Sequence, residues 1–218
     1  MHGINNKKYK KIGFFPITGD PIHYNHLLAA MTTLEFLNLY VVFIQVCGNV
    51  KHYKPNKLSK YHRYKMAKLA IAEYYPYLQY LNIDNDKLIG EEIFINFCNS
   101  YKSYNNDKLY YMAGIDNELI VLKRFNENKN KINRPFEIVF INRCNNMLKN
   151  FVCDGNKIFE KFWSPFLDTK IINCMDKQLK INPLVEEISS TLFREHKRID
   201  IVPTKVLNYC KKYNLYGY

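Results

Sequence analysis

The sequence contains no long apolar run. Its longest candidate, Leu39 to Val46, covers eight residues and includes Gln45, whereas a membrane-spanning helix needs about 20 apolar residues. The first eleven residues are polar and basic, and the apolar stretch behind them is interrupted by Pro16 and Gly19. A secretory signal is therefore not expected. These absences predict a cytoplasmic protein with no membrane partner.

Glycine, proline and arginine are also scarce. Eight Gly and eight Pro among 218 residues exclude a collagen-like or low-complexity chain. The six cysteines form no CxxC pair and lie at no zinc-like spacing from histidine, so neither a zinc site nor a disulfide framework is expected. The net charge of +12 comes almost entirely from lysine. This excess is typical of an AT-rich genome, and a phosphate-bearing partner is the alternative explanation.

The hydrophobic and charged fractions, 47% and 24%, are ordinary for a globular protein. Apolar, β-branched runs predict strands at 10–15, 40–46, 109–113 and 136–141, and a further short one at 170–172. Helical periodicity predicts helices at 26–37, 60–73, 117–125 and 203–213, and the polar segments 99–107 and 126–135 are predicted to be loops. Strand–helix alternation predicts an α/β fold, a Rossmann-like doubly wound parallel sheet with helices on both faces. We expect one domain over residues 1–218 with a C-terminal helical part at about 184–218.

In such a sheet the ligand binds at the carboxyl ends of the strands. The segment after the first predicted strand is PITGDPIHYNH, in which His23 and His26 stand three residues apart at the opening of a helix. A helix N-terminus attracts anions, and two imidazoles there can stabilise charge on a phosphoryl group. The alternatives are two structural histidines or a metal pair, but no third ligand stands at a suitable spacing, so no protein-held metal is expected.

A second segment, ISSTLFR, covers residues 188–194. Ser189, Ser190 and Thr191 are good helix N-caps before apolar residues. Arg194 follows in the early part of that helix. The segment is either a simple capped helix with a solvated arginine or a second phosphate cradle of hydroxyls, backbone N–H groups and one guanidinium.

Together the two segments resemble a known family. TGDPIHYNH is similar to the [ST]-F-D-P-x-H-x-G-H signature of the adenylyltransferase branch of the nucleotidyltransferase superfamily. ISSTLFR is similar to the I-S-S-T-x-[IF]-R signature of nicotinate- and nicotinamide-mononucleotide adenylyltransferases. Weaker similarities lie at Tyr53–Pro55, Arg63–Ile71, Ala113–Asp116, Phe140–Arg143 and Val202–Tyr216, so that the resemblance covers nearly the whole chain.

The resemblance implies adenylyl transfer from ATP to a pyridine mononucleotide, which forms a dinucleotide and pyrophosphate in NAD biosynthesis. It implies that Mg²⁺ acts as cofactor, held mainly by the ATP phosphates. The implied roles are catalysis for His23, His26 and Arg194; ATP phosphate binding for Thr18, Lys54, Ser190 and Thr191; ribose or base binding for Gly114, Asp116 and Arg143; and a substrate loop for Phe15, Pro16, Ile17 and Gly19.

The chain departs from the family pattern in the first segment. Pro16 and Ile17 stand where members carry Gly-Gly, Gly19 replaces Phe, and Asn25 replaces the Gly of HxGH. These changes leave open an HxGH nucleotidyltransferase with another acceptor, or a member that only binds nucleotide. A nucleic-acid-binding protein is a third alternative, against which the aromatic residues argue because most fall in apolar stripes. The sequence does not distinguish a nicotinate from a nicotinamide acceptor, or a monomer from a homo-oligomer.

Overall fold

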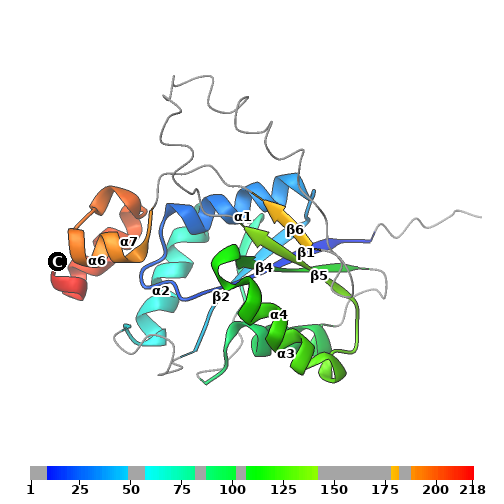
Figure 1. Ribbon diagram of the computed structural model, residues 1–218. Helices are drawn as coiled ribbons and strands as arrows, with labels where there is room; N and C mark the ends of the chain where they lie inside the picture. The colour runs from blue at the N-terminus through cyan, green and yellow to red at the C-terminus, as the bar shows by residue number, and fades with distance from the viewer. Residues whose placement is uncertain (1–8, 49–56, 82–86, 102–106, 142–177, 182–187) are drawn as a thin grey trace, which may run out of the picture.

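A parallel sheet forms the centre of the protein. The computed structural model describes residues 9–48, 57–81, 87–101, 107–141, 178–181 and 188–218 (Figure 1). Within them, the strands are β1 (Lys11–Ile17), β2 (Val41–Val46), β3 (Leu78–Tyr80), β4 (Lys108–Gly114), β5 (Phe136–Ile141) and β6 (Gln178–Ile181). They are all parallel, in the order β3-β2-β1-β4-β5-β6. The order reverses between β1 and β4, where doubly wound sheets bind their ligands.

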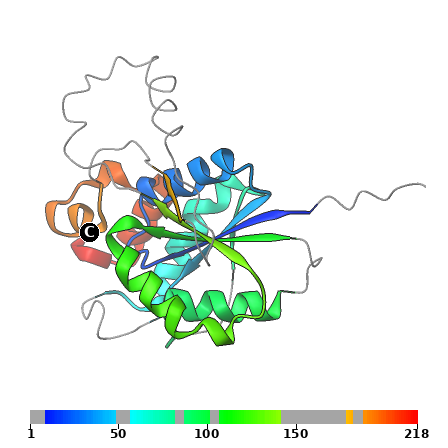
Figure 2. The same ribbon diagram turned by 45° about the vertical axis from the view of Figure 1, so that its right-hand side comes forward.

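Helices cover both faces of this sheet. They are α1 (Tyr24–Phe36), α2 (Lys60–Ile71), α3 (Gly90–Ser100), α4 (Glu118–Glu127), α6 (Ser190–His196) and α7 (Thr204–Lys212). Figures 1 and 2 show α3 and α4 together on one side of the sheet and α1 and α2 on the other. The C-terminal helices α6 and α7 lie beside α2. No helix in these described ranges is long and apolar enough to cross a membrane.

Alternating side chains of the central strands build two separate cores. On β1, Ile12 and Phe14 pack toward α3 and α4, whereas Phe15 and Ile17 pack toward α1 and α2. This is the period of two that a strand imposes on its side chains. A strand buried on both faces has a continuous apolar run in its sequence, which is why the segment KKIGFF at 10–15 predicts one.

The core beneath α3 and α4 is largely aromatic. Phe94 of α3 is 0% exposed. Its ring centroid lies 5.2 Å from that of Phe14, 4.9 Å from Phe136 and 6.0 Å from Phe125. The tilted and edge-on geometry of these pairs is the arrangement that aromatic quadrupoles favour. Six phenylalanines are buried in this core: Phe14, Phe94, Phe97, Phe125, Phe136 and Phe140.

The opposite core includes the C-terminal helices. Phe193, Val206 and Cys210 are each 0% exposed and belong to the same buried cluster as residues of α1 and α2. Because α6 is anchored in this way, its N-terminus is held beside the loop that follows β1. The packing of the C-terminal helices therefore contributes directly to the site described below.

The predicted fold class is confirmed, but several elements differ from the prediction. The sequence did not predict β3, α3 or β6, and the strand predicted at 170–172 lies outside the described residues. The segment 126–135, predicted to be a loop, begins with the last turn of α4 and contains a short helix at Lys129–Lys131. Pro16 and Ile17, placed in the loop, are the last residues of β1. Pro203 is the N-cap of α7 rather than a residue of its first turn.

Candidate active site

The loop of residues 18–23 carries the first group of predicted site residues. It leaves β1 at the carboxyl end of the sheet and enters α1, which begins at Tyr24, two residues earlier than predicted. His23 is therefore the N-cap residue of α1, and His26 lies in its first turn. The backbone N–H groups at this helix end have no carbonyl partner within the helix and attract anions.

The two histidines of this loop lie against each other. Their ring centroids are 3.8 Å apart, and the backbone N–H of His23 donates to Nδ1 of His26 at 3.3 Å. His23 is only 7% exposed, whereas His26 is half-buried. Because Nδ1 of His26 accepts a hydrogen bond, the proton of its neutral form lies on Nε2, which makes Nε2 a donor.

The second predicted motif meets this loop directly. Ser189 caps α6, since its Oγ accepts from the backbone N–H of Leu192 at 3.4 Å. Ser190 Oγ donates to the carbonyl of Pro21 at 3.0 Å, and Arg194 Nη1 donates to the carbonyl of Asp20 at 2.5 Å. Two segments about 170 residues apart in the sequence are thus bonded together at the carboxyl edge of the sheet.

Two further contacts belong to the same junction. Arg194 Nη2 donates to Oγ1 of Thr191 at 3.3 Å, so the guanidinium and this hydroxyl lie side by side. Asn25 Nδ2 donates to the carbonyl of Ile188 at 3.3 Å. The side chain that replaces the Gly of HxGH is therefore directed toward the ISST segment, where it helps to join the two motifs.

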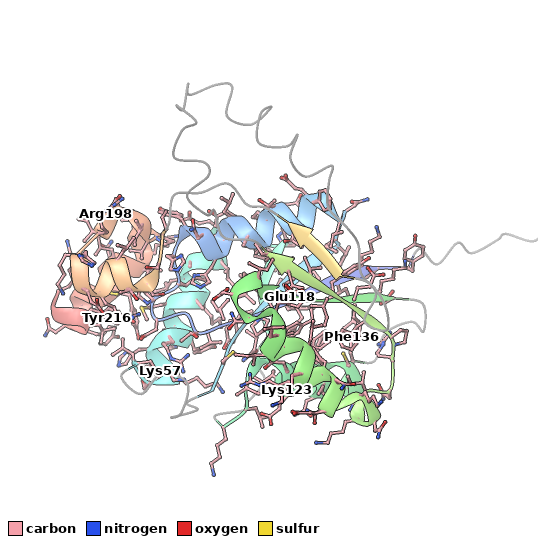
Figure 3. The ribbon with its side chains drawn as sticks, viewed as in Figure 1. Lys57, Glu118, Lys123, Phe136, Arg198 and Tyr216 are labelled. Carbon is pink, nitrogen blue, oxygen red and sulfur yellow. The ribbon has the colours of Figure 1, made fainter. Side chains whose placement is uncertain are left out.

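A buried carboxylate, Asp20, organises the loop from within. It is 4% exposed, and its Oδ1 accepts from the hydroxyl of Tyr216 at 2.7 Å and from the backbone N–H of Leu58 at 3.2 Å. Its Oδ2 lies 3.8 Å from Arg194 Nη1. Burial, and then the charge of Asp20, raise the pKa of Tyr216, so its phenol stays protonated and remains a donor. Figure 3 shows Tyr216 on the C-terminal segment.

Arg63 of α2 fixes the start of the same loop. It is 0% exposed, and its Nη1 donates to the carbonyl of Thr18 at 2.6 Å while its Nε donates to the carbonyl of Leu58 at 2.9 Å. Burial lowers the pKa of Arg63 and the neighbouring charge of Asp20 opposes that change. A buried guanidinium with these partners holds Thr18, a predicted phosphate contact, in one position.

A pocket opens on the other side of Thr18, beside α3 and α4. It lies at the carboxyl ends of β1, β2 and β4. Its lining residues are Pro16, Thr18, Cys47, Gly48, Lys57, Ile89, Gly90, Glu91, Tyr111, Ala113, Gly114, Asn117, Val121 and Arg124. Figure 3 marks Lys57, whose Nζ donates to the carbonyl of Gly48 at 3.0 Å. The pocket and the histidine loop therefore share Thr18 as a common wall.

One ion pair stands in the wall of this pocket. Arg124 Nη1 of α4 lies 3.3 and 3.2 Å from the two carboxylate oxygens of Glu91 in the first turn of α3. The Glu91 side chain is 6% exposed and that of Arg124 is 27% exposed. Burial raises the pKa of Glu91, and Arg124 opposes that rise.

The unusual Pro16 packs against the start of α3. A Cβ atom at Gly90 would lie 2.7 Å from Cβ of Pro16, so only glycine allows this approach. The Pro16 ring thus occupies the wall of the pocket where the family pattern has a bare glycine backbone. Because proline has no N–H, that position offers no hydrogen bond to a ligand.

The remaining predicted residues divide into three groups. Gly114 lines the pocket, and a Cβ there would come within 2.3 Å of Oδ1 of Asp116, so the Asp116 side chain lies over the Gly114 backbone. Phe15 and Ile17 are buried in the core under α1 and α2, and Gly19 is buried in the loop itself. Lys54 and Arg143 lie outside the described residues.

Sequence reasoning assigned no role to Asp20, Arg63, Tyr216, Glu91 or Arg124. The first three lie within segments that resemble the family, so the motifs themselves contained the signal. The pair in the pocket was missed because the sequence did not predict α3, from which Glu91 projects.

The fold and the two adjoining sites are those of a nucleotide-binding α/β protein. Residues 15–196 match the model of the cytidylyltransferase-like family. The chain belongs to this family, which confirms the resemblance found in the sequence.

Proteins named as probable nicotinate-nucleotide adenylyltransferases are similar over almost their whole length. One from Clostridium perfringens is 30% identical over 216 residues, which are 95% of this chain and 98% of the relative. One from Dehalococcoides mccartyi is 30% identical over 217 residues, with 94% and 97% covered. The nicotinic acid mononucleotide adenylyltransferase of Plasmodium falciparum, solved in complex with NaAD, has the same fold at 17% identity, with a TM-score of 0.66 over 96% of this chain and 98% of that one.

Proposed function

We propose that this protein transfers the adenylyl group of ATP to a pyridine mononucleotide, releasing pyrophosphate and forming a dinucleotide. The observation that carries the proposal is the junction of the two motifs, in which Ser190 and Arg194 bond to the loop that bears His23 and His26. Imidazoles, hydroxyls, a guanidinium and two helix N-termini converge there, and each of these groups binds phosphate.

In this reaction a phosphate oxygen of the mononucleotide attacks the α-phosphorus of ATP. The bond from that phosphorus to the bridging oxygen of the β-phosphate breaks, and pyrophosphate leaves with the electron pair. No side chain needs to form a covalent bond, so catalysis consists of positioning and of stabilising negative charge. His23 and His26 act on the α-phosphate, and Thr191 and Arg194 hold the leaving pyrophosphate.

The proposal includes Mg²⁺ bound mainly by the ATP phosphates. Asp20 is the buried carboxylate of the phosphate site, and it is already bonded to Tyr216 and Leu58. In the part of the chain that the structure describes, no three His, Cys, Asp or Glu side chains group as metal ligands. The oxygens of the triphosphate are the proposed ligands of the ion, because Mg²⁺ prefers phosphate and other oxygen ligands and neutralises part of their charge.

The pocket beside α3 and α4 is the proposed site of the mononucleotide. It adjoins the histidine loop through Thr18, so a ligand there lies next to the phosphate site. The names of the bacterial relatives favour the nicotinate form as the acceptor. The proposal also assigns the chain to the cytoplasm, in keeping with the free thiols of Cys47, Cys98 and Cys210.

Matched histidine variants test the proposed catalytic loop. His23→Ala should lower turnover about 100-fold or more, because loss of one transition-state donor typically costs that much. His62→Ala is the control, since His62 lies on α2 and bonds to the hydroxyl of Tyr209, outside this loop. Near-normal turnover of a folded His23→Ala protein would contradict the assignment.

A second pair of variants tests the pyrophosphate contact. Arg194→Ala should weaken ATP binding and slow turnover. The control is Arg198→Ala, because Arg198 forms an exposed ion pair with Asp200 away from the loop (Figure 3). Equal kinetics for the two variants would remove Arg194 from the mechanism.

Replacing ATP by CTP in the same assay distinguishes adenylyl from cytidylyl transfer.

A further inference from the structure

The pocket beside α3 and α4 has the composition that a small, flat, polar-edged ring requires. Pro16, Tyr111, Ala113 and Val121 supply apolar surface. The charged residues of its lining are Lys57, Glu91 and Arg124, and the last two form an ion pair between two different helices. Apolar walls with a few fixed polar groups are typical of specific small-molecule sites.

The stability of the fold does not by itself explain this ion pair. Taking a carboxylate and a guanidinium out of water costs about as much as their attraction returns. Glu91 is among the few buried charged residues of the described chain, and burial raises its pKa. A buried pair that opens onto a binding pocket is therefore better explained by a ligand than by folding.

The two candidate acceptors, the nicotinate and nicotinamide forms of the mononucleotide, differ at one group only. The nicotinate form carries a ring carboxylate, which is an anion, and the nicotinamide form carries a neutral carboxamide. A guanidinium binds a carboxylate through parallel N–H donors, with charge assistance that an amide does not provide. The same site therefore discriminates the two forms strongly if an arginine contacts that group.

We propose that Arg124 and Glu91 determine which pyridine mononucleotide this protein accepts, with Arg124 binding the ring carboxylate of the nicotinate form. This inference rests on the proposed function and specifies its substrate. Glu91 holds the guanidinium at the pocket wall and keeps the pair neutral overall, so that phosphate anions gain little by entering. Its carboxylate also repels the incoming ring carboxylate, which limits the affinity for the nicotinate form.

The two residues therefore have opposite effects on specificity. The measured quantity is the ratio of kcat/KM for the nicotinate form to kcat/KM for the nicotinamide form. Arg124→Met should lower this ratio about tenfold or more, since it removes a charge-assisted hydrogen bond. Glu91→Gln should raise it several-fold, because repulsion is lost while the side-chain shape is kept. Arg124→Lys should restore part of the ratio.

Matched controls separate this effect from a general disturbance. Lys123→Met changes the preceding residue of α4, an exposed lysine marked in Figure 3 that pairs with Glu127, and should leave the ratio unchanged. Arg124→Met alone leaves a buried carboxylate without that partner and risks misfolding. The double variant Glu91→Gln with Arg124→Met removes both charges and should show the same low ratio in a folded protein.

Calorimetric binding of each mononucleotide, without ATP, gives a readout that does not depend on turnover. The inference predicts that the binding preference for the nicotinate form is lost with Arg124→Met and strengthened with Glu91→Gln. A protein whose preference is lost with Arg124→Met but which makes no dinucleotide would refute the proposed function and support the inference. Turnover with a ratio insensitive to Arg124 would refute the inference alone. If Arg124→Met weakened the binding of both mononucleotides equally, the ion pair would have only a structural role and the inference would be overturned. If the wild-type protein bound neither mononucleotide, both the inference and the proposed function would be refuted.

Discussion

Replacing Tyr216 by Phe removes one hydroxyl and tests the buried network around Asp20. That hydroxyl donates to the Asp20 carboxylate at 2.7 Å, and Asp20 is 4% exposed. A hydrogen bond to a charged group contributes about 1.5–3 kcal/mol, so we expect a loss of about 2 kcal/mol in the free energy of unfolding. For a chain of this length that corresponds to a fall of about 4–8 °C in Tm.

The matched control is Tyr218→Phe, which removes a hydroxyl that donates to the neutral carbonyl of Phe193 at 3.1 Å. It should cost about 1 kcal/mol or less. Urea unfolding followed by circular dichroism measures both variants. Because the Asp20 carbonyl also accepts from Arg194, the Tyr216 variant alone should raise the KM for ATP several-fold. Equal stability losses and an unchanged KM would refute the claim that Asp20 and Tyr216 position the phosphate site.

Three further predictions concern the core, the thiols and pH. Phe94→Ala should destabilise the protein by about 3–5 kcal/mol in urea unfolding, and a loss below about 1 kcal/mol would contradict the aromatic core described here. Burial raises the pKa of Cys98 and Cys210 to about 12, so peptide mass spectrometry should find almost no iodoacetamide labelling of either at pH 8 until the protein is unfolded. Rapid labelling of the native protein would refute their burial. Burial also raises the pKa of Glu91 above 4.5, so its contribution to stability is complete below that pH and is lost as the pH rises through the folded-state pKa. Relative to Glu91→Gln, wild-type stability should therefore decline as the pH rises above about 4.5, and parallel pH profiles would contradict the burial of an ionising carboxylate.

The central strands could be predicted because they are buried on both faces. β1, β2, β4 and β5 appear as continuous apolar runs, which few other structures produce. In contrast, β3 has only three residues, which is too short a run to be identified as a strand from its sequence.

The site was predictable only where its residues are close in sequence. The histidine pair and the ISSTLFR segment are local patterns with a physical meaning at a helix N-terminus. The bond from Tyr216 to Asp20 spans 196 residues and the pair of Arg124 and Glu91 spans 33. Such partners are fixed by the packing of the sheet and its helices, which no local pattern contains.

The most direct test of the proposed reaction is mass spectrometry of the products that the purified wild-type protein forms from ATP, Mg²⁺ and nicotinate mononucleotide. The account predicts the dinucleotide and pyrophosphate in equal amounts, with less product when nicotinamide mononucleotide is the acceptor. Intact ATP and mononucleotide after incubation with a folded protein that binds both would contradict it.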